Sequence, residues 1–361
     1  MKSTPVPTPR NSSALRTFAS GLLSIALVIM AGTAANAGTQ QVPREAKTTQ
    51  WVTRPPLQQA RAGLGVATLD RRIYAVGGRA VDGTKYNTVE VRNVSGDGTW
   101  RLLEPLPTAR GNLAVAEAGG MIYAIGGGLG PDDTGAITDI VERYDPTTGH
   151  WAASTPLPEP RIIAGAASLN GILYVSGGVI MGPEGELITD SALAFDPNSG
   201  TWTTIAPMNT AREGHRLVAS GGYVYAIGGG GTGLDSLSTV ERYDPNADSW
   251  QDMPSMQESR WLPCAVATTV GNRKVLVVIA GAEFLPGGAF VDGRRTTEVF
   301  DVDSGQWILL PALLPFVRAS IDCAVESNGS VLSIGGGTHV GEEFIYLSDV
   351  VALRIRPRDL G

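Results

Sequence analysis

The pattern that decides the fold reads RGNLAVAEAGGMIYAIGG at residues 110–127 and, after a polar loop, IVERYDPTTGHW at residues 140–151. Short apolar runs bounded by Gly-Gly or Asp-Pro-x-x-Gly turns predict β-strands joined by tight connections. The stretch holds three such runs and the start of a fourth at Trp151. Four short antiparallel strands predict one blade of a β-propeller.

The same pattern occurs six times. In each copy a tryptophan precedes, by ten or eleven residues, an arginine that opens a β-rich stretch, and most of these stretches end in Gly-Gly. Successive tryptophans lie 49, 51, 51, 48 and 57 residues apart, a period that suits a four-stranded sheet and exceeds that of helical-pair or leucine-rich repeats. The pairs are Trp51/Arg61, Trp100/Arg110, Trp151/Arg161, Trp202/Arg212, Trp250/Arg260 and Trp307/Arg318. The sequence therefore predicts one all-β array of six blades.

An apolar strand ending in Gly-Gly, then an aromatic residue, then a tryptophan seven residues later is the signature of the kelch repeat. Over residues 49–355 the chain therefore resembles exported, bacterial-type kelch proteins, and the resemblance implies a six-bladed kelch β-propeller. Each tryptophan supplies a large apolar surface, about 150 to 250 Å². We expect these indoles to act as wedges between neighbouring blades.

The two ends of the chain predict how the ring closes. No tryptophan follows the third strand of the sixth copy, near Val350, whereas residues 50–53 read QWVT and match the missing outer strand. We expect this N-terminal strand to complete the last blade, which would leave the ring without an open edge.

Residues 1–37 differ from the repeats. A basic flank (Lys2, Arg10, Arg16), an apolar run and Ala35-Asn36-Ala37 are typical of a secretory signal peptide cleaved after Ala37. An uncleaved membrane anchor is the alternative, because about 20 residues can span a bilayer. We assign residues 38–48 to a linker and residues 356–361 to a C-terminal tail. The leader predicts a secreted or periplasmic protein that is not membrane-bound after cleavage.

Charge and composition exclude several classes of function. The formal net charge of −7 becomes −10 when the leader is removed, which argues against nucleic acid as a partner. The three histidines, at positions 150, 215 and 339, do not match the spacing of a metal site, and no cofactor motif is present. We therefore expect neither a metal nor a cofactor, and we expect a monomer.

Strand order places two kinds of connection on one face of the disc, which we call the loop face. They are the loop after each Gly-Gly (the B–C loop) and the segment that enters each first strand (the D–A segment). Binding residues concentrate in variable loops on rigid scaffolds, so we expect the partner here. Apart from Phe284-Leu285 and Phe290-Val291 the loops are polar, which predicts polar contacts. The B–C loops span residues 79–88, 128–139, 179–190, 230–239, 282–297 and 337–348.

The six arginines could form an anion site at the axis. A residue present in every copy more often serves blade packing, however, and we favour that structural role. In kelch domains that bind acidic peptides, further arginines act just inside the first strand. The corresponding residues here, two places after each repeat arginine, are Gly63, Asn112, Ile163, Gly214, Leu262 and Ser320. That mode of binding is therefore not supported.

One departure from the repeats singles out blades four to six. Counting 12 residues back from Gly-Gly gives a small residue in most copies but Arg216 in the fourth. We predict a binding site near the mouth of the channel, where a tryptophan outside the repeats is a platform for sugars or cations. The alternative is a structural ion pair between Arg216 and Asp322. The candidate binding residues are Arg212, Glu213, His215, Arg216, Arg260, Trp261 and Asp322.

The two cysteines leave two interpretations open. The same count places Cys264 and Cys323 at equivalent positions in adjacent blades. Export favours a disulfide, but the Cα atoms would have to lie within about 7 Å, which is tight for neighbouring inner strands. Otherwise both are small core residues.

Two functions follow. The first is an extracytoplasmic, noncatalytic interaction module that binds a protein or a glycan through the B–C loops and D–A segments. The second is a sugar-active enzyme resembling the sialic acid mutarotase type, with Glu213 as base and Arg216 as carboxylate-binding group. A deep axial pocket lined by Glu213, His215 and Arg216 would favour the enzyme. We favour the binding module and assign no catalytic residue under it, because fold alone does not imply activity.

Overall fold

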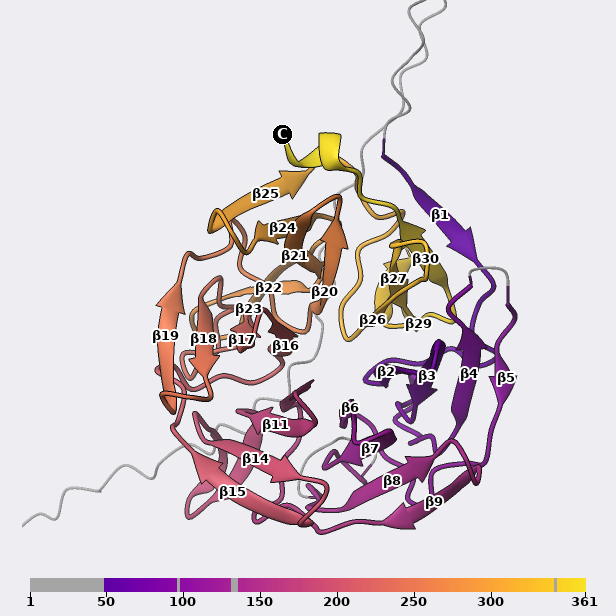
Figure 1. The fold of residues 1–361 in the computed structure, drawn as a ribbon, viewed down its shortest axis with the longest axis vertical. Helices are drawn as coiled ribbons and strands as arrows, with labels where there is room; N and C mark the ends of the chain where they lie inside the picture. Colours follow the sequence, from indigo (N-terminus) through magenta and orange to yellow (C-terminus); the bar gives the residue numbers. More distant parts are fainter. Residues whose placement is uncertain (1–48, 96–97, 131–135, 341–342) are drawn as a thin grey trace, which may run out of the picture. The chain divides into compact units, whose positions relative to one another are not determined.

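The computed structural model describes residues 49–361 except 96–97, 131–135 and 341–342. The signal-peptide and linker predictions lie outside these residues and stay predictions. Six four-stranded antiparallel sheets surround a central axis (Figure 1). The predicted all-β, six-bladed propeller is confirmed.

In each blade the first strand lies innermost and the fourth outermost. Blade one holds β2 (Gly65–Leu69), β3 (Arg72–Val76), β4 (Val89–Asn93) and β5 (Arg101–Leu102). Blade two holds β6 (Ala114–Ala118), β7 (Met121–Ile125), β8 (Val141–Asp145) and β9 (His150–Ala153). Blade three holds β10 (Gly165–Leu169), β11 (Ile172–Ser176), β14 (Ala192–Asp196) and β15 (Thr201–Ile205). Blade four holds β16 (Arg216–Ser220), β17 (Tyr223–Ile227), β18 (Val240–Asp244) and β19 (Ser249–Met253). Blade five holds β20 (Cys264–Val270), β21 (Arg273–Ile279), β24 (Thr297–Asp301) and β25 (Gln306–Leu310).

Both ends of the chain build blade six. It holds β26 (Asp322–Val325), β27 (Val331–Ile334), β30 (Val350–Leu353) and β1 (Trp51–Arg54). Strand β1 pairs antiparallel with β30, from Trp51 opposite Leu353 to Arg54 opposite Val350. The predicted N-terminal closure is confirmed, and Figure 1 shows β1 at the outer edge of blade six.

Three of the six B–C loops are not irregular. They contain the two-stranded ribbons β12 (Val179–Gly182) with β13 (Gly185–Ile188), β22 (Ala282–Leu285) with β23 (Ala289–Gly293), and β28 (Gly337–Val340) with β29 (Glu343–Tyr346). The sequence indicated only loops there because the segments are short and rich in turn residues. The ribbons give part of the loop face a fixed backbone.

The repeat tryptophans link neighbouring blades at the outer rim. Each indole Nε1 donates a hydrogen bond to a carbonyl four or five residues after the preceding tryptophan, at 2.7 to 3.4 Å. Four of the rings also pack on an aromatic residue of the third strand; the centroids of Phe195 and Trp202, for example, lie 4.8 Å apart. Besides packing between blades as predicted, the tryptophans thus form hydrogen bonds to the neighbouring blade, which the spacing alone did not predict.

The six repeat arginines are buried, with at most 2% of any of them exposed. Four form ion pairs with a third-strand glutamate of the same blade, as Arg212 does with Glu241 at 2.6 Å. Blades three and six carry Leu193 and Val351 at the glutamate position. Burial lowers the pKa of Arg61 to about 10, so this guanidinium stays charged at neutral pH.

The backbone of the repeat arginines explains why the second strand of most blades ends in Gly-Gly. The N–H of the second glycine, or its equivalent, donates to the carbonyl of the repeat arginine in the next blade, at 2.8 to 3.0 Å in all six blades. These glycines have φ between +90° and +105°, which disfavours a side chain. The arginines therefore hold each blade internally and to its neighbour, which supports the structural role.

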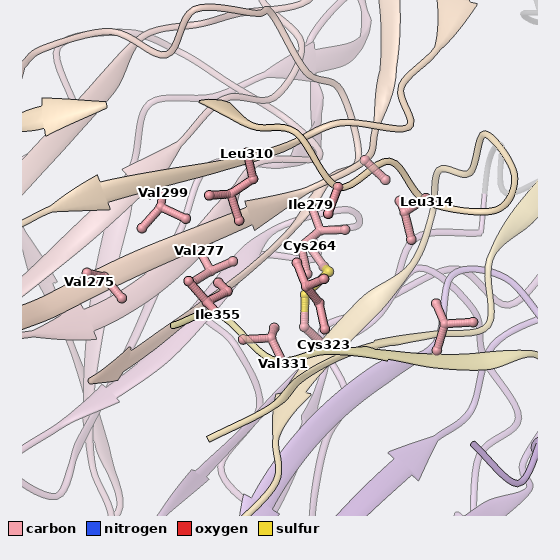
Figure 2. Close-up of a cluster of buried hydrophobic side chains, with 14 of the residues drawn as sticks. Cys264, Val275, Val277, Ile279, Val299, Leu310, Leu314, Cys323, Val331 and Ile355 are labelled. Carbon is pink, nitrogen blue, oxygen red and sulfur yellow. A yellow bond between two sulfur atoms is a disulfide. The ribbon is translucent and has the colours of Figure 1, made fainter. Parts of the chain in front are cut away.

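The two cysteines form a disulfide between blades five and six, with Cα atoms 5.6 Å apart. The predicted equivalence of their positions is wrong: Asp322, not Cys323, opens its strand as Cys264 does, because the blade-six hairpin is one residue longer. Since successive side chains of a strand point to opposite faces, this one-residue offset lets the two sulfurs face each other. Figure 2 shows the disulfide in a buried cluster that also includes Ile279 and Leu314.

The segment 356–361, which we assigned to a tail, packs on the propeller. The 3₁₀ helix η1 (Pro357–Leu360) buries Leu360 in the cluster around the disulfide. The Oδ2 of Asp359 accepts a hydrogen bond from the hydroxyl of Thr49 at 2.7 Å, next to β1. The C-terminus thus supports the closing strand.

Candidate functional site

The mouth of the channel on the loop face is closed by a ring of backbone hydrogen bonds. In each blade the residue two places after the repeat arginine donates its N–H to the carbonyl of the same residue in the preceding blade, at 2.7 to 3.2 Å. All six have φ between +50° and +61°, a conformation that non-glycine residues seldom adopt. The ring residues are Gly63, Asn112, Ile163, Gly214, Leu262 and Ser320. Their polar backbone groups are engaged with one another rather than presented to a ligand.

Behind the ring, a channel of about 380 Å³ is lined by the first strands of all six blades. Most of its wall consists of alanine, valine and other small residues, with Arg216, Asp322 and Glu117 as the charged exceptions. A separate, smaller cavity of about 20 Å³ lies at the ring and is lined by the six ring residues and their neighbours. The loop face therefore has a plugged centre, and Glu213 lines neither space.

Two of the predicted binding residues lie out of a ligand's reach. Arg212 and Arg260 are fully buried, and their guanidinium groups donate to backbone carbonyls and to glutamates of their own blades. Their burial follows from the repeat, in which each arginine holds its Gly-Gly turn. Any contact between these side chains and a partner would be indirect.

Glu213 and Trp261 lie side by side across the boundary between blades four and five. The indole Nε1 of Trp261 donates to Oε1 of Glu213 at 2.9 Å, and Glu213 is 5% exposed. The Trp261 ring packs edge-to-face on Phe284, with centroids 5.2 Å apart. The pair is thus a junction between blades with little of its carboxylate accessible.

His215 is buried between blades three and four. Its Nε2 lies 3.0 Å from the hydroxyl of Ser176, and its Nδ1 has no hydrogen-bond partner among the described residues. A Cβ on Gly165 would approach His215 Nε2 to 2.8 Å, so glycine there makes room for the imidazole. Burial, with the charges of Arg212 and Arg216, lowers the pKa of His215 well below its usual value.

His215 should make the stability of the propeller depend on pH. Because its pKa is lower in the folded state, the unfolded chain binds the proton more tightly, and stability falls as the pH drops below about 6.5. The slope approaches about 1.4 kcal/mol per pH unit. Replacing His215 by leucine, the residue that blades one and two carry at this place, should flatten the dependence. Urea unfolding of both proteins at pH 7.5 and 5.5 measures it; equal losses of unfolding free energy would contradict this role.

Arg216 and Asp322 are neighbours in the channel wall but do not form the direct ion pair that was the alternative interpretation. Arg216 donates from Nε to the carbonyl of Pro263 at 2.9 Å and from Nη2 to the carbonyl of Ile321. The carboxylate of Asp322 accepts the backbone N–H groups of Val66 and Cys323, each at 2.8 Å. Burial raises the pKa of Asp322, and the nearby Arg216 charge opposes that shift. Both side chains thus tie blades together.

The structure therefore brings the seven predicted residues together around blades four to six but engages most of them internally. Among residues 49–361, gaps excepted, no group of three histidine, cysteine or acidic side chains is arranged to hold a metal ion. Over the same residues, no helix has the length and apolarity to cross a bilayer. Whether any of the seven contacts a ligand stays a prediction.

Sequence reasoning missed the apolar character of the loop face. Ten of the thirteen large apolar side chains that are exposed in the described part of the chain lie in B–C loops or the last D–A segment. They are Val81, Leu129, Met181, Leu187, Leu234, Leu285, Phe290, Val291, Leu313 and Phe316. Phe284, by contrast, is 4% exposed. The loop face is thus more apolar than the sequence indicated, and polar contacts with a partner stay a prediction. The leucines and methionine could have been counted in the loops, but their exposure depends on how the ribbons fold.

Six blades, Gly-Gly turns that receive the next blade's arginine, and indoles bonded across the rim define a propeller of the kelch-repeat class. The comparison with protein families agrees: residues 63–281 match the KLHDC2/KLHL20/DRC7 Kelch-repeats domain. The chain belongs to this kelch-repeat family.

Curated relatives match part of the chain. Kelch-like protein 35 of Mus musculus is 34% identical over 168 residues, which cover 46% of this chain and 25% of that protein. Kelch-like protein 38 of Homo sapiens is 32% identical over 209 residues, covering 58% and 34%. The match thus spans between a quarter and about a third of these relatives' length.

A solved structure shares the fold. The structure of YjhT superposes with a TM-score of 0.71, covering 85% of this chain and 98% of that one, at 18% sequence identity. At this identity the likeness concerns the fold alone.

Proposed function

We propose that this chain is a noncatalytic interaction module that binds a protein partner through its loop face. The observation that carries the proposal is the gathering of exposed large apolar side chains in the B–C loops and the last D–A segment. Exposed large apolar side chains that are concentrated on one face of a protein, rather than distributed over its whole surface, favour that face as an interaction site. Kelch domains generally mediate protein interactions, and this chain belongs to that family.

The scaffold supports such a role. Three of the B–C loops are paired ribbons, and every blade is bonded to both neighbours by backbone hydrogen bonds. Apolar side chains held on a rigid frame lose little conformational freedom on binding, which favours affinity. A plugged centre leaves the rim of the face, rather than the axis, as the surface for a partner.

The sugar-active alternative and a glycan ligand have less support. A general base has to reach its substrate, but the carboxylate of Glu213 is buried against the Trp261 indole and lines neither the channel nor its mouth. Arg216 uses Nε and Nη2 on carbonyls of blades five and six. One edge of the Trp261 ring is committed to Glu213, and Phe284 packs against it, which reduces its value as a sugar platform.

We further propose that the module acts in the secreted or periplasmic space. The Cys264–Cys323 disulfide supports this location, because such bonds persist in oxidising compartments. Protein recovered from the extracytoplasmic fraction should begin at Gly38 and carry no free thiol. A membrane-bound chain with an intact leader would contradict cleavage, and a chain confined to the cytoplasm would contradict export.

Substitutions on the loop face should strongly weaken partner binding, whereas substitutions of similarly exposed leucines on the outer strands should not. We expect the loop-face variant to lose at least tenfold in affinity for the protein that the wild type retains from its extracytoplasmic fraction, and the outer-strand variant to lose less than twofold. Titration by biolayer interferometry measures both. The loop-face variant is Val81→Ser, Met181→Ser, Leu285→Ser and Phe316→Ser; the outer-strand variant is Leu102→Ser and Leu309→Ser. Equal affinities, or retention of a glycan but no protein, would overturn the proposal.

A further inference from the structure

Building on the proposed function, we infer that blades four and five carry a preformed docking platform for an extended segment of the partner protein. The platform consists of Leu234, at the tip of the blade-four loop, with Phe290 of the β22–β23 ribbon. The segment that fits it has a large apolar side chain next to a lysine or arginine.

The loop and the ribbon are joined into one body. The backbone of Ser236 donates to the carbonyl of Phe284 at 3.0 Å, and the N–H of Phe284 donates to the Ser236 hydroxyl at 2.9 Å. That hydroxyl donates in turn to the carbonyl of Ala282 at 3.1 Å. Near the tip, the N–H of Gly287 donates to the carbonyl of Gly233 at 2.8 Å. Four hydrogen bonds across a blade boundary fix the platform before a partner arrives, so binding need not order it.

An aromatic stack supports the exposed ring of the platform. Trp261 and Phe284 pack edge-to-face at 5.2 Å, and Phe284 packs on Phe290 at 5.4 Å. Glu213 holds Trp261 through the indole N–H. Phe290 therefore has a fixed position while 40% of it remains exposed. A rigid aromatic that is held at its base and open to solvent is a good anchor at an interface.

Leu234 adds an independent sign of function. It adopts φ +60° and is 41% exposed. For a residue with a bulky side chain this left-handed conformation is unfavourable, and glycine would adopt it without strain. Unlike Ile163 and Leu262, which adopt this conformation within the hydrogen-bonded ring, Leu234 keeps 41% of its surface exposed, which is consistent with a contact made with another molecule.

Charge selects the class of partner. Asp235 follows Leu234 and Asp292 lies two residues after Phe290, and neither carboxylate forms an ion pair with another described residue. In the described part of the chain, Asp292 accepts only the neighbouring N–H of Gly293, at 2.7 Å. Glu283, which pairs with Asp292 across the ribbon, is neutralised by Arg294. Two carboxylates beside an apolar anchor favour a basic segment, and opposite charges across an interface raise specificity and association rate.

An array of 12-residue peptides tests the platform. Each peptide carries a Leu-Phe pair flanked by lysines, by glutamates or by serines. We expect the mature wild-type protein to bind the lysine set at least tenfold more tightly than the glutamate set, with serine between. Asp292→Lys should reverse that order.

Matched truncations locate the site. Leu129 on blade two is also 41% exposed and lies on the same face. We expect Leu234→Ala to weaken peptide binding at least tenfold and Leu129→Ala by less than twofold. Leu234→Gly should bind as weakly as Leu234→Ala yet melt at the same temperature as the wild type or higher, because it relieves the strain. A Leu234→Gly protein that melts lower and binds normally would show a structural role and overturn the inference.

The remaining outcomes separate the inference from the proposed function. Peptides that bind but respond to Leu129→Ala rather than Leu234→Ala would overturn the platform and leave the loop face as an interaction surface. An array without binders, or one that prefers glutamate, would overturn the platform as well. The proposed function then stands or falls on the loop-face and outer-strand variants described above.

Discussion

Deleting residues 49–55 should unfold the propeller under conditions in which the full chain is folded. The deletion removes β1, and with it the Trp51 indole and the hydrogen bonds to β30. It also removes Arg54, whose Nε and Nη2 bind both oxygens of the buried Glu326 at 2.9 and 2.8 Å. Loss of a buried ion pair and of a packed tryptophan each costs about 3 to 5 kcal/mol. Their combined loss is comparable with the whole stability of a typical domain, about 5 to 15 kcal/mol.

Near-ultraviolet circular dichroism and urea unfolding measure this loss. A peptide spanning residues 48–56, added in excess, should restore the folded signal because it can occupy the edge of β30, whereas a scrambled peptide should not. The Arg54→Ala peptide should rescue less well, since Glu326 would keep only Arg92, at 2.9 Å. A deletion protein with the unfolding midpoint of the wild type would refute the closure by β1.

Replacing both cysteines by alanine should lower the free energy of unfolding by about 2 to 4 kcal/mol. The disulfide joins residues 59 positions apart, for which the chain-entropy account gives about 4 kcal/mol, and the measured contribution of a disulfide is often smaller than this account predicts. The effect arises because the crosslink restricts the unfolded chain and holds blade five to the blade that β1 completes.

Reduced wild type separates the crosslink from packing. It retains both sulfurs, so it should lose nearly as much stability as the double-alanine protein if the crosslink matters most. Urea titrations with and without dithiothreitol measure the difference. A double variant with an unchanged midpoint, or reduced protein as stable as oxidised, would contradict this account.

The blades could be predicted because each copy repeats the same large residues at the same spacing. The Trp51 to Trp307 series counted the blades, and the missing tryptophan after Val350 indicated the closure. The sequence could not decide whether the two cysteines pair, because one extra residue in the hairpin before Val331 shifts the register of blade six. Counting residues back from Gly-Gly cannot detect this shift. The shift nevertheless decides to which face of the strand the Cys323 side chain points.

The site was less predictable for a related reason. Arg216 was singled out because it departs from the repeat, and Glu213 because it lies close to Arg216 in the sequence, but the structure shows both in contacts between blades. The hydrogen-bonded ring at the mouth could not be predicted, because Asn112 and Ile163 adopt a positive φ there. Glycine at these positions would have indicated that conformation. Exposure of Leu234 and Phe290 depends on how two loops pair across a blade boundary, which no single repeat encodes.

The ring of six N–H···O=C bonds at the mouth has a consequence for how the molecule comes apart. A linear solenoid frays from its terminal units, where each repeat has a single neighbour. Here the ring of hydrogen bonds passes through every blade and closes where the N–H of Gly63 donates to the carbonyl of Ser320. Every blade therefore has two neighbours, and no end blade can unfold first. Breathing of one blade strains both flanking blades, and melting should be all-or-none, with amide exchange at the ring as slow as global opening.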